Sequence, residues 1–170
     1  KNAPDNELAE IPLCGEVKMN EERTPYALPW HPFLVGWIIA TGTRDCTKGV
    51  YHLHKDYACL TKCKALGYNV FVSRKKGSNE CIFARFDHNI RRQIFGKGKV
   101  RDSFIPDLYM YASVESRWEL LKAIMTVSGG HSKKHPQLIL PNKKFITQVA
   151  ELARSLGIWV KQDTVNDDVE

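Results

Sequence analysis

A short stretch near the start of the chain, Pro32–Thr43, limits the possible folds more than any other. Its sequence is PFLVGWIIATGT, in which Pro32 suits the first position of a helix and Gly42 suits a helix end. Apolar side chains would lie on every side of this helix, so none of its faces could stand in water. The apolar run is only about half the roughly 18 residues of a membrane-spanning helix. We therefore predict a short helix that is buried in the core of a globular domain.

A second helix that ends in glycine is predicted at Ser113–Val127, before Gly129 and Gly130. Apolar residues recur in it at helical spacing and fall near a single face: Val114, Trp118, Leu121 and Met125. The chain therefore has two such helices, far apart in sequence, and each of them needs a surface to pack against.

The elements that follow the two helices come in a similar order. After the first helix we predict a strand at Gly49–Leu53, a helix at His54–Leu66, a hairpin of Tyr68–Ser73 with Glu80–Phe86, and a helix at Asp87–Phe95. After the second we predict a strand at His135–Leu140, a helix at Lys143–Leu156 capped by Asn142, and a strand at Ile158–Gln162. Both amphipathic helices end in Leu-Gly, within CKALGYNV and ARSLGIWV. The pattern is typical of a diverged internal duplication, and the alternative is an unrelated α/β domain in which the first helix is simply core.

The two glycine-ended helices resemble the paired motif of the LAGLIDADG homing endonucleases, of the kind embedded in inteins. LVGWIIATG, residues 34–42, keeps the first Leu, the internal Gly, the Ala and the final Gly of that nine-letter motif. LKAIMTVSG, residues 121–129, resembles a weaker second copy, and the flanking IPDL, SRWELLKA and AELARSLG resemble the surroundings of the second motif in intein endonucleases. The resemblance covers about residues 33–162.

The resemblance implies an α/β (α+β) fold with two αββαββα halves related by a pseudo-twofold axis, the second half being shorter here. It also implies that the motif helices pack side by side, with Gly36 and Ala123 allowing close approach and with Gly42 and Gly129 at the helix ends. In the family each helix end carries an acid, and the two acids share divalent metal ions. Such ions activate water and stabilise the negative charge that develops on phosphate during hydrolysis.

The two acid positions of the family correspond here to Thr41 and Ser128. Neither side chain is negatively charged, and a hydroxyl is a weak sole protein ligand for Mg²⁺. The resemblance therefore implies a degenerate centre with no catalytic residue, no metal ion and no cofactor. The alternative is a Mg²⁺-dependent endonuclease that uses other acids, for instance Asp45, which lies beyond the predicted helix end.

Basic residues are concentrated in the middle of the chain. The net charge is +6, but residues 44–101 carry fourteen Lys or Arg against four Asp or Glu, whereas both ends are acidic. The resemblance implies a saddle of antiparallel strands in the DNA major groove, to which the hairpin would contribute Arg74, Lys75, Lys76 and Arg85. Further candidates for phosphate contacts are Arg44, Lys48, Arg91, Arg92, Lys97, Lys99, Arg101, Lys133 and Lys134. We therefore expect double-stranded DNA as the partner. The alternatives are a maturase-like RNA-binding factor, and an inert intein insert or protein-interaction module with a solvated lysine-rich face.

The cysteines predict reduced thiols and not disulfides, because they are odd in number and thinly spread: Cys14, Cys46, Cys59, Cys63 and Cys81. A structural zinc site that uses some of the last four together with His52 and His54 is the alternative, although their spacing matches no common zinc finger.

The sequence suggests three regions. Residues 1–29 form an extended lead-in, residues 30–162 form the domain, with repeats at about 32–112 and 113–162, and residues 163–170 form an acidic tail. We find no membrane span and no signal peptide. We expect an intracellular protein, nuclear in a eukaryote, that is a monomer with internal pseudo-symmetry.

Overall fold

The structure is a computed structural model that describes residues 15–41, 50–53, 57–69, 71–74, 82–85, 104–131, 135–138, 140 and 142–162. In chain order the elements are α1 (Pro32–Thr41), β1 (Val50–Leu53), α2 (Tyr57–Ala65), β2 (Phe71–Arg74), β3 (Ile82–Arg85), α4 (Asp107–Met110), α5 (Val114–Ser128), β4 (Gly129–His131), β5 (Pro136–Leu138) and α6 (Lys143–Ser155). Helices combined with small antiparallel sheets give an α+β class, as predicted. Within the described ranges, no helix is both long and apolar enough to cross a membrane.

Helix α1 is the buried helix that the sequence predicts, and it begins at Pro32. Residues 32–39 are all buried, and Leu34 and Val35 are completely so. The helix begins here because the Nδ1 atom of His31 accepts a hydrogen bond from the N–H of Phe33, at 3.2 Å. Proline at the next position has no N–H that would need a partner. His31 therefore caps α1.

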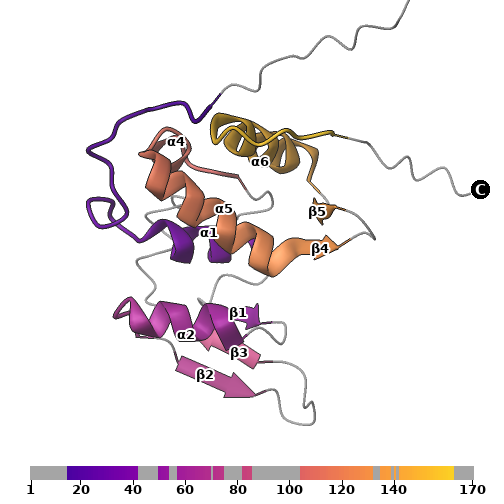
Figure 1. The fold of residues 1–170 in the computed structure, drawn as a ribbon. Helices are drawn as coiled ribbons and strands as arrows, with labels where there is room; N and C mark the ends of the chain where they lie inside the picture. Colours follow the sequence, from indigo (N-terminus) through magenta and orange to yellow (C-terminus); the bar gives the residue numbers. More distant parts are fainter. Residues whose placement is uncertain are drawn as a thin grey trace, which may run out of the picture.

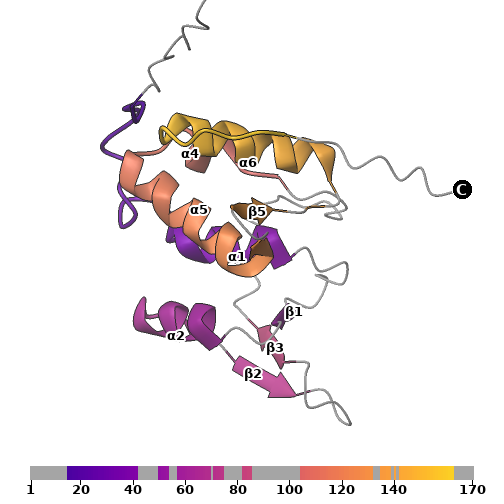
Figure 2. The same cartoon turned by 45° about the vertical axis from the view of Figure 1, so that its right-hand side comes forward.

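Helix α5 provides the surface against which α1 packs. Its cap is Ser113, whose side chain accepts a hydrogen bond from the N–H of Ser116, and the cap at its other end is Gly129. The views in Figures 1 and 2 both show α1 and α5 side by side in the middle of the molecule. The buried face differs from the predicted one, because it consists of Ser116, Arg117, Leu120, Leu121, Ala123 and Ile124. Val114, Trp118 and Met125 are only partly buried, since α1 packs against the side of the helix that carries the small Ala123.

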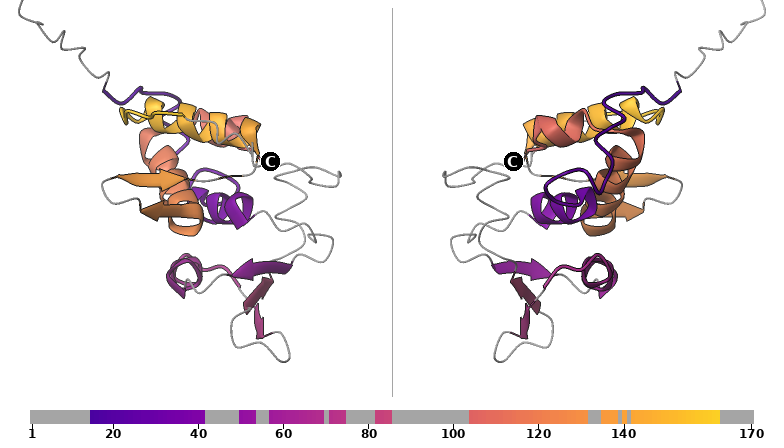
Figure 3. Two further views of the ribbon diagram at one scale, coloured as in Figure 1. Left: turned by 90° about the vertical axis from the view of Figure 1, so that its right-hand side faces the viewer. Right: turned by 90° about the vertical axis from the view of Figure 1, so that its left-hand side faces the viewer.

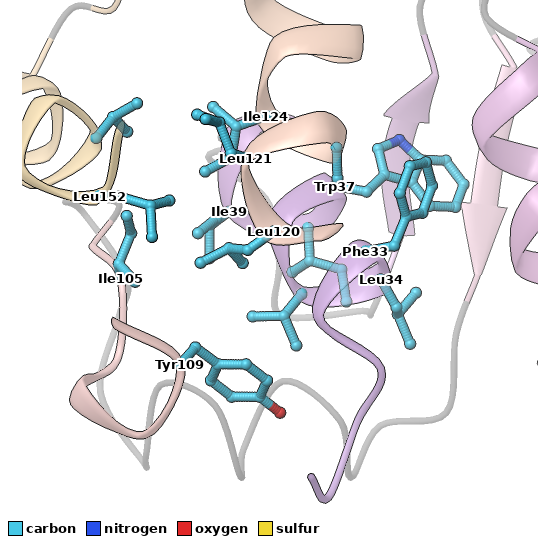
Figure 4. Close-up of a cluster of buried hydrophobic side chains, with 14 of the residues drawn as sticks. Phe33, Leu34, Trp37, Ile39, Ile105, Tyr109, Leu120, Leu121, Ile124 and Leu152 are labelled. Carbon is cyan, nitrogen blue, oxygen red and sulfur yellow. The ribbon is translucent and has the colours of Figure 1, made fainter. Parts of the chain in front are cut away.

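Two groups of elements cover the helix pair on opposite sides. Figures 1 and 2 show α2 with β1, β2 and β3 on one side and α6 on the other. Between these groups, Figure 4 shows Phe33 and Trp37 of α1 together at one side. At the other side it shows Leu152 of α6 together with Ile105, which precedes α4. All four side chains are at most 4% exposed. The core is therefore centred on the α1–α5 pair.

Both sheets are antiparallel. The larger one has the strand order β1-β3-β2, and its β2–β3 pair is the predicted hairpin, with Phe71 opposite Arg85 and Arg74 opposite Ile82. The smaller sheet pairs β4 with β5, and Gly129 lies opposite Leu138. The sequence did not predict β4, because two of its three residues are glycines that carry no side chain to show an alternating pattern.

The strand predicted at Ile158–Gln162 is not found. This segment pairs with no strand in the part of the chain that the structure describes, and it lies along α6. The guanidinium of Arg154 donates to the carbonyl oxygen of Val160 at 3.2 Å, and the Gln162 amide donates to the hydroxyl of Thr147 at 3.3 Å. Strand-like residues form a strand only where a second strand is within reach. The helix predicted at Asp87–Phe95 lies outside the described residues.

The described part of the lead-in, residues 15–29, contains no helix or strand. Figure 3 shows this indigo segment running from the neighbourhood of α6 to the start of α1. The N–H of Val17 donates to the carbonyl oxygen of Ser155 at 2.9 Å, and the side-chain amide of Asn20 donates to the carbonyl oxygen of Tyr111 at 2.6 Å. The segment is therefore held by individual hydrogen bonds to the helices that it passes.

Candidate functional site

The helices α1 and α5 approach each other closely at Gly36. A Cβ atom added to Gly36 would lie 2.6 Å from the carbonyl oxygen of Leu120 and 2.8 Å from the Cβ of Ala123. These distances leave no room for any side chain, so only glycine lets the two backbones meet in this way. The structure thus brings together Gly36 and Ala123, the two residues that the sequence assigns to a helix interface.

The carboxyl-terminal ends of the two helices also meet. The hydroxyl of Ser128 donates to the carbonyl oxygen of Ala40 at 3.3 Å. Thr41 is the last residue of α1, but its side chain and the whole of Gly42 lie outside the described residues. Gly129 caps α5, and a Cβ there would lie 2.2 Å from a carbonyl oxygen of the same helix. Gly36 contacts Ala123, and further along both helices Ala40 contacts Ser128. The two helices therefore run in the same direction.

The chemistry at these helix ends is that of backbone carbonyls and a neutral hydroxyl. Each helix carboxyl terminus carries roughly half a negative charge, so two converging ends repel a phosphate unless a cation lies between them. Hard divalent cations are held by several oxygen ligands, with carboxylates among them. In the described ranges, no group of three or more His, Cys, Asp or Glu could hold a metal ion. Among the described residues at the helix ends, the oxygen atoms are therefore uncharged, and they do not make the carboxylate set that holds a divalent metal ion.

Two of the predicted nucleic-acid-binding residues have a described backbone: Arg74 in β2 and Arg85 in β3. Residues opposite each other in a sheet share a face, and neighbours along a strand alternate between faces. Because position 71 pairs with 85 and position 74 pairs with 82, positions 74 and 85 fall on opposite faces. The hairpin register therefore separates these two positions, and the nucleic-acid-binding roles of Arg74 and Arg85 stay predictions. The other candidates, from Arg44 to Lys134, lie outside the described residues.

Lys62 of α2 contacts both crossing helices. Its ammonium nitrogen lies 2.5 Å from a carboxylate oxygen of Glu119 on α5 and 4.0 Å from the ring centre of Phe33 on α1. The other oxygen of Glu119 pairs with Lys122 at 3.0 Å. Partial burial alone would raise the pKa of Glu119, but the hydrogen bonds from Lys62 and Lys122 lower this pKa below its ordinary value. The sequence did not reveal this contact, because its partners lie far apart in the chain.

Cys59 and Cys63 lie on one face of α2, and both thiols are fully buried. Burial, together with the neighbouring Cys59, raises the pKa of Cys63 to about 12. A thiol with such a pKa is inert as a nucleophile near neutral pH. Of the other members of the alternative zinc set, His52 has only its backbone described, and Cys46, His54 and Cys81 lie outside the described residues. The reduced, buried state agrees with the prediction for these two cysteines.

Arg117 is the buried residue that the sequence reading missed, and it is fully inaccessible. Its Nε atom donates to the carbonyl oxygen of Ala112 at 2.9 Å, and one terminal nitrogen donates to the carbonyl and hydroxyl oxygens of Ser155 at 2.9 and 2.6 Å. The other terminal nitrogen donates to the carbonyl oxygen of Val17. Burial lowers the pKa of Arg117 from its ordinary value. In a helix, residues three and four positions apart lie on the same face. Arg117 therefore shares the face of the core residues Leu120 and Leu121, and this spacing was its one signal in the sequence.

In comparisons with known proteins, no protein-family model and no curated protein matches this chain. Its function must therefore be inferred from its own residues and their geometry.

Proposed function

We propose that the chain is a diverged, catalytically inactive LAGLIDADG-type domain that binds double-stranded DNA. The observation that carries the proposal is the crossing of α1 and α5, in which Gly36 meets Ala123. These two residues hold the same, third, place in the two copies of the motif. Contact between the same position of two copies is what a twofold relation requires. The hydroxyl-bearing ends of both helices then lie at the same end of the pair.

The ends of α2 and α6 support a duplication. Each helix is followed by a glycine with positive φ, 83° at Gly67 and 78° at Gly157. In each case the residue after the glycine donates to a carbonyl oxygen five residues earlier, at 3.1 Å: Tyr68 to Cys63, and Ile158 to Ala153. The caps therefore agree in sequence, backbone conformation and hydrogen bonding.

Burial in the same two helices also supports the duplication. When the Leu-Gly ends are aligned, Cys59 corresponds to Val149 and Cys63 corresponds to Ala153. The four side chains are exposed by only 0%, 4%, 0% and 6% in that order. The thiols thus hold positions where the other copy has small apolar side chains, which favours a core role over zinc binding.

Loss of cleavage follows from what the helix ends contain. Hydrolysis of a phosphodiester at the pseudo-dyad needs metal ions between the scissile phosphate and the protein. The hydroxyl of Ser128, which is bonded to the carbonyl of Ala40, supplies neither negative charge nor a strong ligand. The two converging helix ends therefore give no stabilisation to the charge that would develop on phosphate.

Binding depends on a different set of residues, so it can persist without cleavage. The basic stretch of residues 44–101 includes β1, β2 and β3, which lie on one side of the helix pair in Figure 1. Lysine and arginine contacts to phosphates give affinity that is independent of base sequence and sensitive to salt. The strand register places positions 74 and 85 on opposite faces of the hairpin. Lys75 and Lys76, which follow β2 in the sequence, are therefore the basic residues of the hairpin that we choose for the test.

The test is fluorescence anisotropy with a labelled DNA duplex at increasing salt. If about four phosphates are neutralised, affinity should fall about a hundredfold between 50 and 200 mM monovalent salt. The double variant Lys75→Gln, Lys76→Gln should weaken binding and reduce the salt slope by about two phosphate contacts. Lys143→Gln, Lys144→Gln is the matched control, because it removes the same charge from exposed positions of α6, across the helix pair from the hairpin.

Three outcomes would contradict the proposal, each in a different way. Absence of duplex binding even at low salt would indicate an inert insert or a protein-interaction module. Tighter binding to a structured RNA of equal length than to the duplex would indicate a maturase-like factor. Nicking of a plasmid library in Mg²⁺ or Mn²⁺, abolished by Asp45→Asn, would indicate an active nuclease.

A further inference from the structure

His31 lies at a junction of three parts of the molecule and is only 7% exposed. Its Nδ1 atom accepts the hydrogen bond from the N–H of Phe33 that caps α1. The backbone N–H of His31 donates to the hydroxyl of Tyr68, after α2, at 2.8 Å. The ring of Tyr26 meets the imidazole edge-on, with ring centres 5.6 Å apart. The imidazole therefore contacts the lead-in and the start of α1, and the backbone of the same residue contacts Tyr68 after α2.

The cap works only while Nδ1 carries no proton. A neutral imidazole offers one nitrogen as an acceptor, but in the imidazolium both nitrogens are donors, so the N–H of Phe33 would face another N–H. The charged ring would also lie at the positive end of the α1 dipole. Protonation at this site therefore removes an attraction and adds a repulsion.

Burial lowers the pKa of His31, and among the charged neighbours Glu119 and Glu115 of α5 oppose this shift whereas Lys62 of α2 adds to it. Glu119 is itself paired with Lys62 and Lys122, so its charge is largely balanced. Tyr26 meets the ring edge-on, and the hydroxyl of Tyr68 lies at the backbone N–H of the same residue. The surroundings thus favour the neutral imidazole that the cap requires.

We propose that His31 is a protonation-sensitive cap, which releases the start of α1 when the imidazole takes up a proton. The effect reaches the α1–α5 pair because Phe33, the residue whose N–H is released, is a core residue only 4% exposed. Phe33 also lies under the ammonium of Lys62. Loss of the cap therefore loosens a contact to which both α1 and α2 contribute.

The proposal predicts the direction of a pH effect on stability. The folded pKa of His31 lies below the ordinary value of 6.5, so the unfolded chain takes up this proton first. The contribution is fully present above pH 6.5 and is lost as the pH falls through the lower folded pKa. Between pH 7.5 and 5.5 this single proton can raise the unfolding equilibrium constant by up to about tenfold.

The test compares urea unfolding at pH 7.5 and 5.5 for the unaltered protein, His31→Asn and His135→Asn. Asparagine is a good cap that cannot take up a proton in this range. The ratio of the unfolding equilibrium constants at pH 5.5 and pH 7.5 should therefore be up to about tenfold smaller for His31→Asn than for the unaltered protein. His135 is exposed, and its replacement should leave the pH effect unchanged. Equal pH effects in all three proteins would overturn the proposal.

A second measurement on the unaltered protein decides the question even if His31→Asn does not fold. The hydrogen-exchange protection factor of the Phe33 amide should fall between pH 7.5 and 5.5 more than that of the Ile124 amide in the middle of α5. Equal changes at both amides would show that the cap does not respond to protonation.

Discussion

Arg117 shows how one buried cation can hold a segment that has no secondary structure of its own. Its guanidinium donates hydrogen bonds to oxygen atoms of three segments. These are Ala112 just before α5, Ser155 at the end of α6, and Val17 in the chain before α1. The charge is thus solvated by carbonyl and hydroxyl oxygens, and no carboxylate takes part in these hydrogen bonds. The planar fork of arginine can reach three directions at once, which lysine cannot.

Replacing Arg117 by methionine should therefore destabilise the protein strongly. Arg117→Met fills much of the same volume but leaves buried carbonyl groups without donors, at a cost of about 1–3 kcal/mol each, so we expect a loss of at least about 3 kcal/mol. Urea unfolding followed by tryptophan fluorescence measures the change. Arg154→Met is the control, because Arg154 is exposed and makes one bond to Val160, so its removal should cost less than about 1 kcal/mol. Equal losses in the two variants would contradict this role for Arg117.

At the scale of elements, close approach of α1 to α5 depends on small side chains at the crossing. Gly36 meets Leu120 and Ala123 at distances that no side chain would tolerate, and the exposed fraction of Ala123 is 0%. In an exposed helix, glycine costs up to about 1 kcal/mol relative to alanine. The chain retains glycine at this position of an apolar helix, which fits a requirement for contact between backbones.

Gly36→Ala therefore tests the crossing by the sign of its effect. If the helices were loosely packed, alanine would stabilise α1 by up to about 1 kcal/mol. With the observed geometry, the added methyl group meets the Leu120 carbonyl, and we expect destabilisation of about 1–3 kcal/mol in thermal unfolding. Gly15→Ala is the control, since a Cβ there meets nothing within 4 Å. A stabilised Gly36→Ala protein would refute the close crossing.

At the scale of the whole molecule, two converging helix ends lie between two groups of elements that cover the pair. The ends favour a cation through their dipoles, but their described residues supply no charged ligand that would hold one. In the proposed duplicated arrangement, Thr41 and Ser128 are equivalent positions at these ends. This centre would then differ from one that binds a divalent metal ion by the side chains at these two positions only.

Restoring both acids should create a metal site. We expect the double variant Thr41→Asp, Ser128→Asp to bind Mg²⁺ or Ca²⁺ with a heat that calorimetry detects. Without metal, the two carboxylates at helix carboxyl termini should lower the thermal unfolding midpoint, and added metal should raise it again. In the control, Ser128→Asp is replaced by Thr126→Asp, which places the second carboxylate at an exposed position of α5. Equal metal binding by both double variants, or none by either, would show that positions 41 and 128 do not form a shared centre.

The sequence alone determined the features that depend on neighbouring residues. The starts of α1, α5 and α6 follow from Pro32, Ser113 and Asn142, because a cap is formed within one helical turn. The Leu-Gly ends of α2 and α6 follow from the need for positive φ at Gly67 and Gly157. The need to bury α1 followed from its composition, although its partner did not.

Tertiary structure decided whatever depends on distant segments. It selected the face of α5 that α1 covers, and it enclosed Arg117. It also placed Ile158–Gln162 beside α6, where none of the described strands pairs with this segment. It also fixed the hairpin register that separates Arg74 from Arg85. Capping and periodicity depend on residues within a turn or two, whereas burial depends on which surfaces meet when the chain closes on itself. A local pattern can therefore state that a surface must be covered, but the identity of the covering surface is set only in the folded chain.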